Sequence, residues 1–94
     1  MSTYAVTYVY NATAEQLAEV RPIHRQWLND QLNAGVLLAS GPMVDVAKAL
    51  LIWKAESASE LAALLDHDPF DIAGFISERD IEEWNPVFGP WSAA

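Results

Sequence analysis

The chain is organised around residues 36–55, which read VLLASGPMVDVAKALLIWKA. Two apolar runs, 36–39 and 47–55, are rich in residues that favour β-strands. A serine, a glycine and a proline at 40–42 end the first run, and the residues at 43–47 have the length of a hairpin link. We therefore predict two neighbouring strands in the middle of the chain.

A strand and a helix are predicted on the N-terminal side of this hairpin. Residues 3–10 alternate Tyr4, Val6, Tyr8 and Tyr10 with smaller residues, which is the pattern of a strand. Thr13, followed three positions later by Gln16, has the form of a capping box, so we expect a helix to open at Ala14.

Pro22 divides the helical region in this prediction. We expect it to interrupt or restart the helix, so that the main segment runs from about residue 22 to residue 34 and ends at Gly35 in a left-handed turn. His24 is placed at the edge of the buried stripe. The residues that form the stripe itself are Ile23, Trp27, Leu28 and Leu32.

A second helix and strand follow the hairpin. Ser57 with Glu60 makes another capping box, and the apolar residues of the helix that follows precede Asp68, which we expect to cap the next turn. Residues 75–84 form the last candidate strand. The order is βαββαβ, which predicts an α+β, ferredoxin-like fold with a four-stranded antiparallel sheet, and residues 1–94 fit one domain.

Such a fold carries both helices on one face of the sheet, which leaves the other face uncovered in a monomer. Several strands have apolar residues on both sides, and apolar residues make up 52% of the chain. Burying the open face against a second copy would remove that surface from water. We therefore expect a homodimer.

Composition limits the function further. Thirteen acidic against five basic residues give a net charge of −8, which argues against a nucleic-acid or anionic-membrane partner. The absence of cysteine excludes disulfides, thiolate metal sites and a cysteine nucleophile. No signal sequence or run of ~20 apolar residues is present, so we expect a cytoplasmic protein.

Two short motifs carry the candidate chemistry. His24 ends the motif RPIH at 21–24, and Asp68 opens the motif DPF at 68–70. A carboxylate that holds one imidazole nitrogen leaves the other free to transfer a proton near neutral pH. The alternative is structural: His24 is satisfied by the backbone, and Asp68 only caps a turn. His67, the second histidine, is expected to face solvent.

Other residues are candidates for substrate binding. Ser40, before Gly41, is expected to present its hydroxyl and nearby amides to a substrate oxygen, although a purely structural turn accounts for it equally well. Arg21 is a candidate anchor for a carboxylate, unless it is simply solvated. Phe70 completes the substrate-binding set. The histidines and acids show no metal-binding spacing, so no metal or cofactor is expected.

Five segments stand out along the chain: RPIH (21–24), LASGP (38–42), ALLI (49–52), DPF (68–70) and IEEWNP (81–86). Through these segments the chain resembles the YCII-related family from about Tyr4 to Val87. This resemblance implies a ferredoxin-like fold that pairs into a dimeric α/β barrel, a group that includes muconolactone isomerase. In the family, the histidine corresponding to His24 and the acid corresponding to Asp68 are regarded as an active-site pair.

The resemblance also has a limit. Many relatives have a glycine-rich loop where this chain has MVDVAK at 43–48, so the entrance to the pocket is expected to differ.

The family includes an enzyme that removes chloride from a chlorinated hydroxyquinol. We therefore expect a small-molecule enzyme that uses His24 and Asp68 for isomerisation or elimination on a small cyclic or aromatic metabolite. The alternative is a non-catalytic, ligand-binding or accessory dimer.

Overall fold

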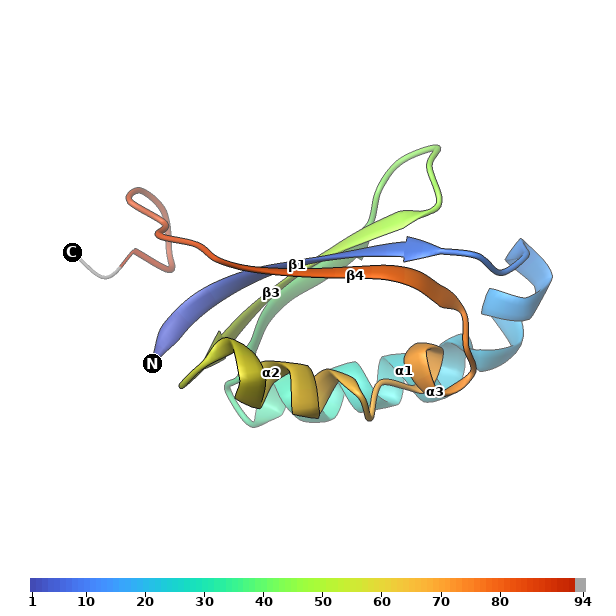
Figure 1. The fold of residues 1–94 in the computed structure, drawn as a ribbon, viewed down its shortest axis with the longest axis horizontal. Helices are drawn as coiled ribbons and strands as arrows, with labels where there is room; N and C mark the ends of the chain where they lie inside the picture. The colour runs from blue at the N-terminus through green and yellow to red at the C-terminus, as the bar shows by residue number, and fades with distance from the viewer. Residues whose placement is uncertain (93–94) are drawn as a thin grey trace.

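The computed structural model describes residues 1–92 and confirms the predicted order of elements. Within that part of the chain, one extra short helix, α3, follows α2 (Figure 1). The elements are β1 (Ser2–Tyr10), α1 (Ala14–Asn33), β2 (Leu37–Pro42), β3 (Lys48–Ala55), α2 (Ala58–Leu65), α3 (Pro69–Ile72) and β4 (Ile76–Glu83).

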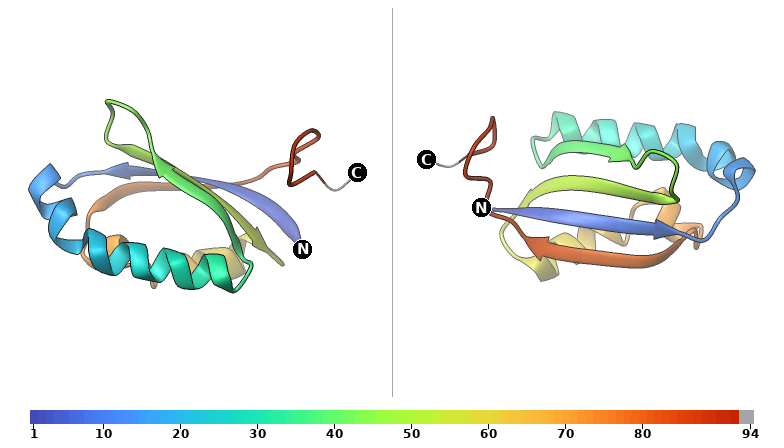
Figure 2. Two further views of the ribbon diagram at one scale, coloured as in Figure 1. Left: turned by 180° about the vertical axis from the view of Figure 1, so that it is seen from behind. Right: turned by 90° about the horizontal axis from the view of Figure 1, so that it is seen from above.

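The four strands form one antiparallel sheet in the order β2-β3-β1-β4, and the helices lie along one face of it (Figures 1 and 2). Alternation along the strands turns every second side chain towards the helices. Tyr8, Leu51 and Trp53 are fully buried on this side, as are Leu61 and Leu65 of α2. The fold is therefore α+β and ferredoxin-like.

Helix α1 begins as predicted but continues through Pro22. The Thr13 side chain accepts a hydrogen bond from the backbone N–H of Gln16, whose own side chain accepts one from the Thr13 N–H. The expected interruption is wrong, because the exposed Pro22 leaves the carbonyl of the exposed Ala18 accessible to water. The first turns of α1 lie at an angle to the rest (Figure 2), a bend that the missing N–H of Pro22 explains.

The buried side of α1 also differs from the prediction. Ile23 is 64% exposed and Leu32 is 50% exposed, whereas His24 is the buried residue of the helix. Trp27 and Leu28 are partly buried against the core, as expected. Successive residues on a helix are about 100° apart, so a helix that turns His24 towards the sheet turns its neighbour Ile23 outwards. A polar contact, described below, compensates for burying the imidazole.

The opposite face of the sheet has no helix on it. Its centre is apolar, whereas β4 contributes three carboxylates and β3 contributes two lysines at the margins. The residues on this open face include Ala5, Thr7 and Val9 of β1, Lys48, Leu50, Ile52 and Lys54 of β3, and Glu78, Asp80 and Glu82 of β4. Within residues 1–92, no helix combines the length and the apolar character that crossing a membrane requires.

Candidate functional site

Asp68 lies in the short connection between α2 and α3, where it caps the second of these helices. Its Oδ1 atom accepts a hydrogen bond from the backbone N–H of Phe70 at 2.8 Å, and Pro69 occupies the first helical position. Asp and Pro at these two positions are the local reason that α3 begins here. The cap is unusual in one respect: the side chain of Asp68 is completely buried.

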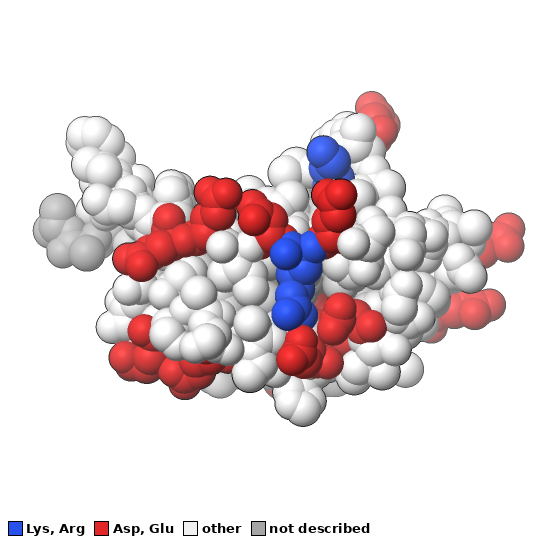
Figure 3. Space-filling view, viewed as in Figure 1, with Lys and Arg blue, Asp and Glu red and all other residues white. Residues whose placement is uncertain are grey.

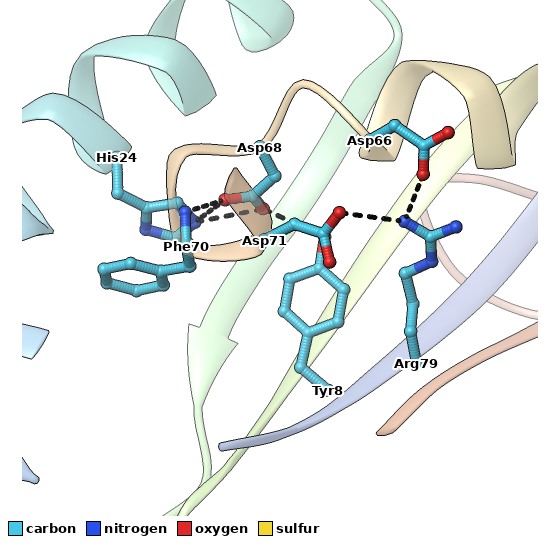
Figure 4. Close-up of polar contacts among 7 residues, drawn as sticks. All are labelled: Tyr8, His24, Asp66, Asp68, Phe70, Asp71 and Arg79. Atoms are coloured by element: carbon cyan, nitrogen blue, oxygen red, sulfur yellow. Dashed lines mark hydrogen bonds and ion pairs between the residues drawn. The ribbon is translucent and has the colours of Figure 1, made fainter. Parts of the chain in front are cut away.

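His24 reaches the same carboxylate from α1. Its Nε2 atom lies 3.3 Å from each of the two carboxylate oxygens of Asp68 (Figure 4). A carboxylate accepts hydrogen bonds, so Nε2 carries the proton in this contact and Nδ1 is left as the basic nitrogen of a neutral ring. The imidazole also stacks on the ring of Phe70, with centroids 3.8 Å apart and planes 18° apart. Its orientation is thus fixed from two sides.

Tyr8 is the third residue at this carboxylate. Tyr8 lies near the C-terminal end of β1, and its hydroxyl donates a hydrogen bond to Oδ2 of Asp68 at a distance of 2.9 Å. Burial, followed by the nearby carboxylate of Asp68, raises the pKa of Tyr8 far above its ordinary value of 10.0, so the phenol remains a donor. The sequence analysis missed this contact. The signal was the inward position of Tyr8 on β1, because a buried tyrosine hydroxyl usually finds a partner.

Asp68 therefore makes the contacts that both interpretations require of it. It caps a helix, and it contacts His24 as the dyad interpretation requires. The ring of His24 contacts this carboxylate, and a catalytic role for the pair stays a prediction. His67 is exposed, as expected from its position next to Asp68.

A cavity of about 630 Å³ opens between α1, the whole of β2 and the first half of β3. Every predicted substrate-binding residue lines it, namely Arg21, Ser40, Gly41 and Phe70. His24 lines it as well, whereas Asp68 lies behind the imidazole and outside the lining. The structure thus brings six sequence-predicted residues together as a cavity wall and its support.

The cavity wall contains further residues outside the predicted substrate-binding set. Tyr10 contacts Phe70 edge-to-face, with ring centroids 5.7 Å apart. Burial, with a smaller contribution from the carboxylate of Asp68, raises the pKa of Tyr10 to about 12. Arg25 and Asn29 line the cavity from α1. Their spacing of four residues from Arg21 onwards was the available signal, because residues four apart share a helix face.

A second polar cluster stands beside the His24 contact without entering the cavity. Arg79 of β4 pairs with Asp66 at 3.0 Å and with Asp71 at 3.6 Å (Figure 4). These contacts join β4 to the end of α2 and to α3. Among residues 1–92, no group of three His, Asp or Glu side chains lies close enough to hold a metal ion.

Comparison with known proteins identifies the family. The model of the YCII-related domain matches residues 1–85. The chain belongs to the YCII-related family. None of the curated proteins compared with this YCII-related chain matches it significantly.

Solved structures share the fold of this YCII-related protein at low identity. One is 5-chloro-2-hydroxyhydroquinone dehydrochlorinase (TftG) from Burkholderia phenoliruptrix AC1100 in complex with 2,5-dihydroxybenzoquinone, with a TM-score of 0.77 at 19% identity over 88% of this chain and 93% of that one. Protein Atu4242 from Agrobacterium tumefaciens has a TM-score of 0.58 at 19% identity over 99% and 98% of the two chains. A NIPSNAP domain protein from Burkholderia xenovorans has a TM-score of 0.58 at 18% identity over 96% and 99%.

Proposed function

We propose that the protein is an enzyme that moves a proton on a small cyclic or aromatic metabolite, in an isomerisation or an elimination, without a cofactor. The observation that carries this proposal is the 3.3 Å contact between His24 and Asp68 in the wall of a cavity. Membership in the YCII-related family and likeness to a dehydrochlorinase with a ring compound bound add support.

The proposed roles follow from the hydrogen bonds. Asp68 holds Nε2–H of His24, which keeps the Nδ1 lone pair available to remove a proton from the substrate. Tyr8 and the Phe70 N–H hold the carboxylate itself. When Nδ1 accepts the proton, the imidazolium is stabilised by the adjacent carboxylate. It then returns the proton to another substrate atom, or keeps it while a leaving group departs.

The test uses His24→Gln and Asp68→Asn with a panel of lactones and halogenated phenols. Each variant is expected to lose at least 100-fold in kcat, which is the low end of what general acid–base catalysis contributes. The matched control is His67→Gln, which removes the other, exposed histidine and should leave turnover unchanged. Full activity in both test variants would refute the assignment, and saturable binding without product in the wild type would favour a ligand-binding module.

We also propose that two copies pair through the open face of the sheet. Leu50 lies at its centre and is exposed in one copy, and pairing would bury it. The carboxylates of β4 and the lysines of β3 make the face electrostatically self-complementary, because a two-fold axis can bring the acids of one copy towards the lysines of the other.

Sedimentation equilibrium tests this pairing. The wild type is expected at about twice the chain mass of 10.4 kDa. Leu50→Asp should give a folded monomer, because Leu50 is already 38% exposed in one copy. Ile72→Asp adds the same charge at an exposed position of α3, on the helix side of the sheet (Figure 1), and it should not change the mass. A wild-type monomer would contradict the proposal.

A further inference from the structure

The wall of the cavity differs in charge from the rest of the molecule. The chain has 13 acidic and five basic residues, yet Arg21, Arg25 and Lys48 line the cavity and no Asp or Glu does. The face formed by β4 and α2 is, by contrast, mostly acidic (Figure 3). A locally basic cavity in a protein of net charge −8 concentrates positive potential where a ligand would bind.

The two arginines provide the stronger part of this argument. They lie one turn apart on α1, on the face that also carries His24. Lys48 is different, because its neighbour Ala49 on β3 is buried on the helix side and successive side chains of a strand point to opposite faces, so the side chain of Lys48 points to the open face of the sheet. Anion binding is therefore argued from Arg21 and Arg25 alone.

Neither arginine forms an ion pair in the part of the chain that the structure describes. Within residues 1–92, which include every Asp and Glu of the chain, the ion pairs involve only His24 and Arg79, so Arg21 and Arg25 have no carboxylate within 4.0 Å. Like charges four residues apart on a helix repel each other. An anion held between the two guanidinium groups would remove that repulsion.

The rest of the cavity suits a flat apolar group. Phe70 stacks on His24 and contacts Tyr10 edge-to-face, and leucines 28, 37 and 51 are among the apolar residues that line the same cavity. A volume of about 630 Å³ is ample for one ring with substituents.

We infer that the substrate is a monocyclic carboxylate, whose carboxylate binds Arg21 and Arg25 and whose ring lies against Tyr10 and Phe70. This inference rests on the proposed function, because it places the ring beside His24. A guanidinium group binds a carboxylate through two parallel hydrogen bonds, which a neutral group of the same shape does not reproduce.

Calorimetric titration with benzoate and with benzamide tests the inference, because these probes have nearly the same shape and differ in charge. The wild type should bind benzoate at least ten times more tightly than benzamide. Arg21→Met and Arg25→Met should each weaken benzoate binding at least fivefold, with little effect on benzamide. Gln26→Met is the matched control, because it places the same side chain at an exposed position of α1 that does not line the cavity. It should leave both affinities unchanged.

The outcomes separate this inference from the proposed function. Equal affinity for the two probes, no binding of either at 10 mM, or an equal loss in Gln26→Met would overturn the anionic substrate. His24→Gln should retain the preference for benzoate, since His24 is assigned to proton transfer and not to holding the anion. If benzoate binding depends on the arginines while His24→Gln and Asp68→Asn retain full turnover, the anion site stands and the proposed catalytic roles fall.

Discussion

Nε2 of His24 lies 3.3 Å from each carboxylate oxygen of Asp68, although 44 positions separate the two residues in the sequence. This contact joins the middle of α1 to the N-terminus of α3 and lies between the core and the cavity. The same carboxylate accepts hydrogen bonds from Tyr8 and from the backbone of Phe70. One buried side chain therefore fixes a strand, a helix start and the proposed catalytic imidazole, and its loss is expected to affect both stability and turnover.

Asp68→Ala should lower the free energy of unfolding by about 3 kcal/mol. The substitution removes a helix cap and leaves the buried Tyr8 hydroxyl without its acceptor, and each of these losses costs about 1–2 kcal/mol. Urea denaturation measures the effect. Asp66→Ala is the control, because it breaks a partly exposed ion pair with Arg79 and should cost less than about 1 kcal/mol. Equal losses in the two variants would contradict the structural role of Asp68.

Tyr8→Phe should reduce both stability and kcat through Asp68. Removing the hydroxyl leaves the buried carboxylate with one donor fewer, for an expected cost of about 1–3 kcal/mol in unfolding free energy. A double-mutant cycle with Asp68→Asn, measured on the free energy of unfolding, separates this contact from general packing. The coupling energy between the two substitutions should reach about 1 kcal/mol. If Tyr8 only fills space, the stability losses of Tyr8→Phe and Asp68→Asn will add, and Tyr8→Phe will leave KM and kcat unchanged.

The fold and most of the site were predictable because their signals are local. Capping boxes, strand alternation and the hairpin link lie within a few residues of sequence, and the motifs around His24 and Asp68 selected the correct pair for a contact. What failed depends on tertiary structure. Helix α1 continues through Pro22 because the Ala18 carbonyl, which loses its helical donor there, is exposed. His24 is buried in preference to Ile23 because its ring contacts Asp68, 44 residues further along the chain.

Gly35→Ala should lower stability by about 1 kcal/mol. Gly35 ends α1 at φ = 81°, in the left-handed region that side chains disfavour, and a Cβ there would contact nothing within 4 Å. The cost is therefore backbone strain and not a steric clash. Thermal unfolding of Gly35→Asn is the comparison, because asparagine tolerates this conformation better and should lose less. A larger loss for asparagine than for alanine would contradict this explanation.

Stability should decline at alkaline pH, in part through Tyr10. Burial, with a smaller effect of the Asp68 carboxylate, raises the pKa of this phenol to about 12 from its ordinary 10.0. The unfolded chain therefore releases the proton first. The contribution of Tyr10 is complete below pH 10 and is lost as the pH rises from 10 towards 12. A shift of this size would lower the free energy of unfolding by ~1.4 kcal/mol at pH 11, and solvent around the partly buried ring reduces the expected loss to about 1 kcal/mol.

Urea denaturation of the wild type and of Tyr10→Phe between pH 8 and pH 11 measures this loss of stability. The difference between the two proteins should shrink by that amount across the range, because the variant keeps every other titrating group. A difference that stays constant with pH would show that the Tyr10 phenol titrates alike in the folded and unfolded chain.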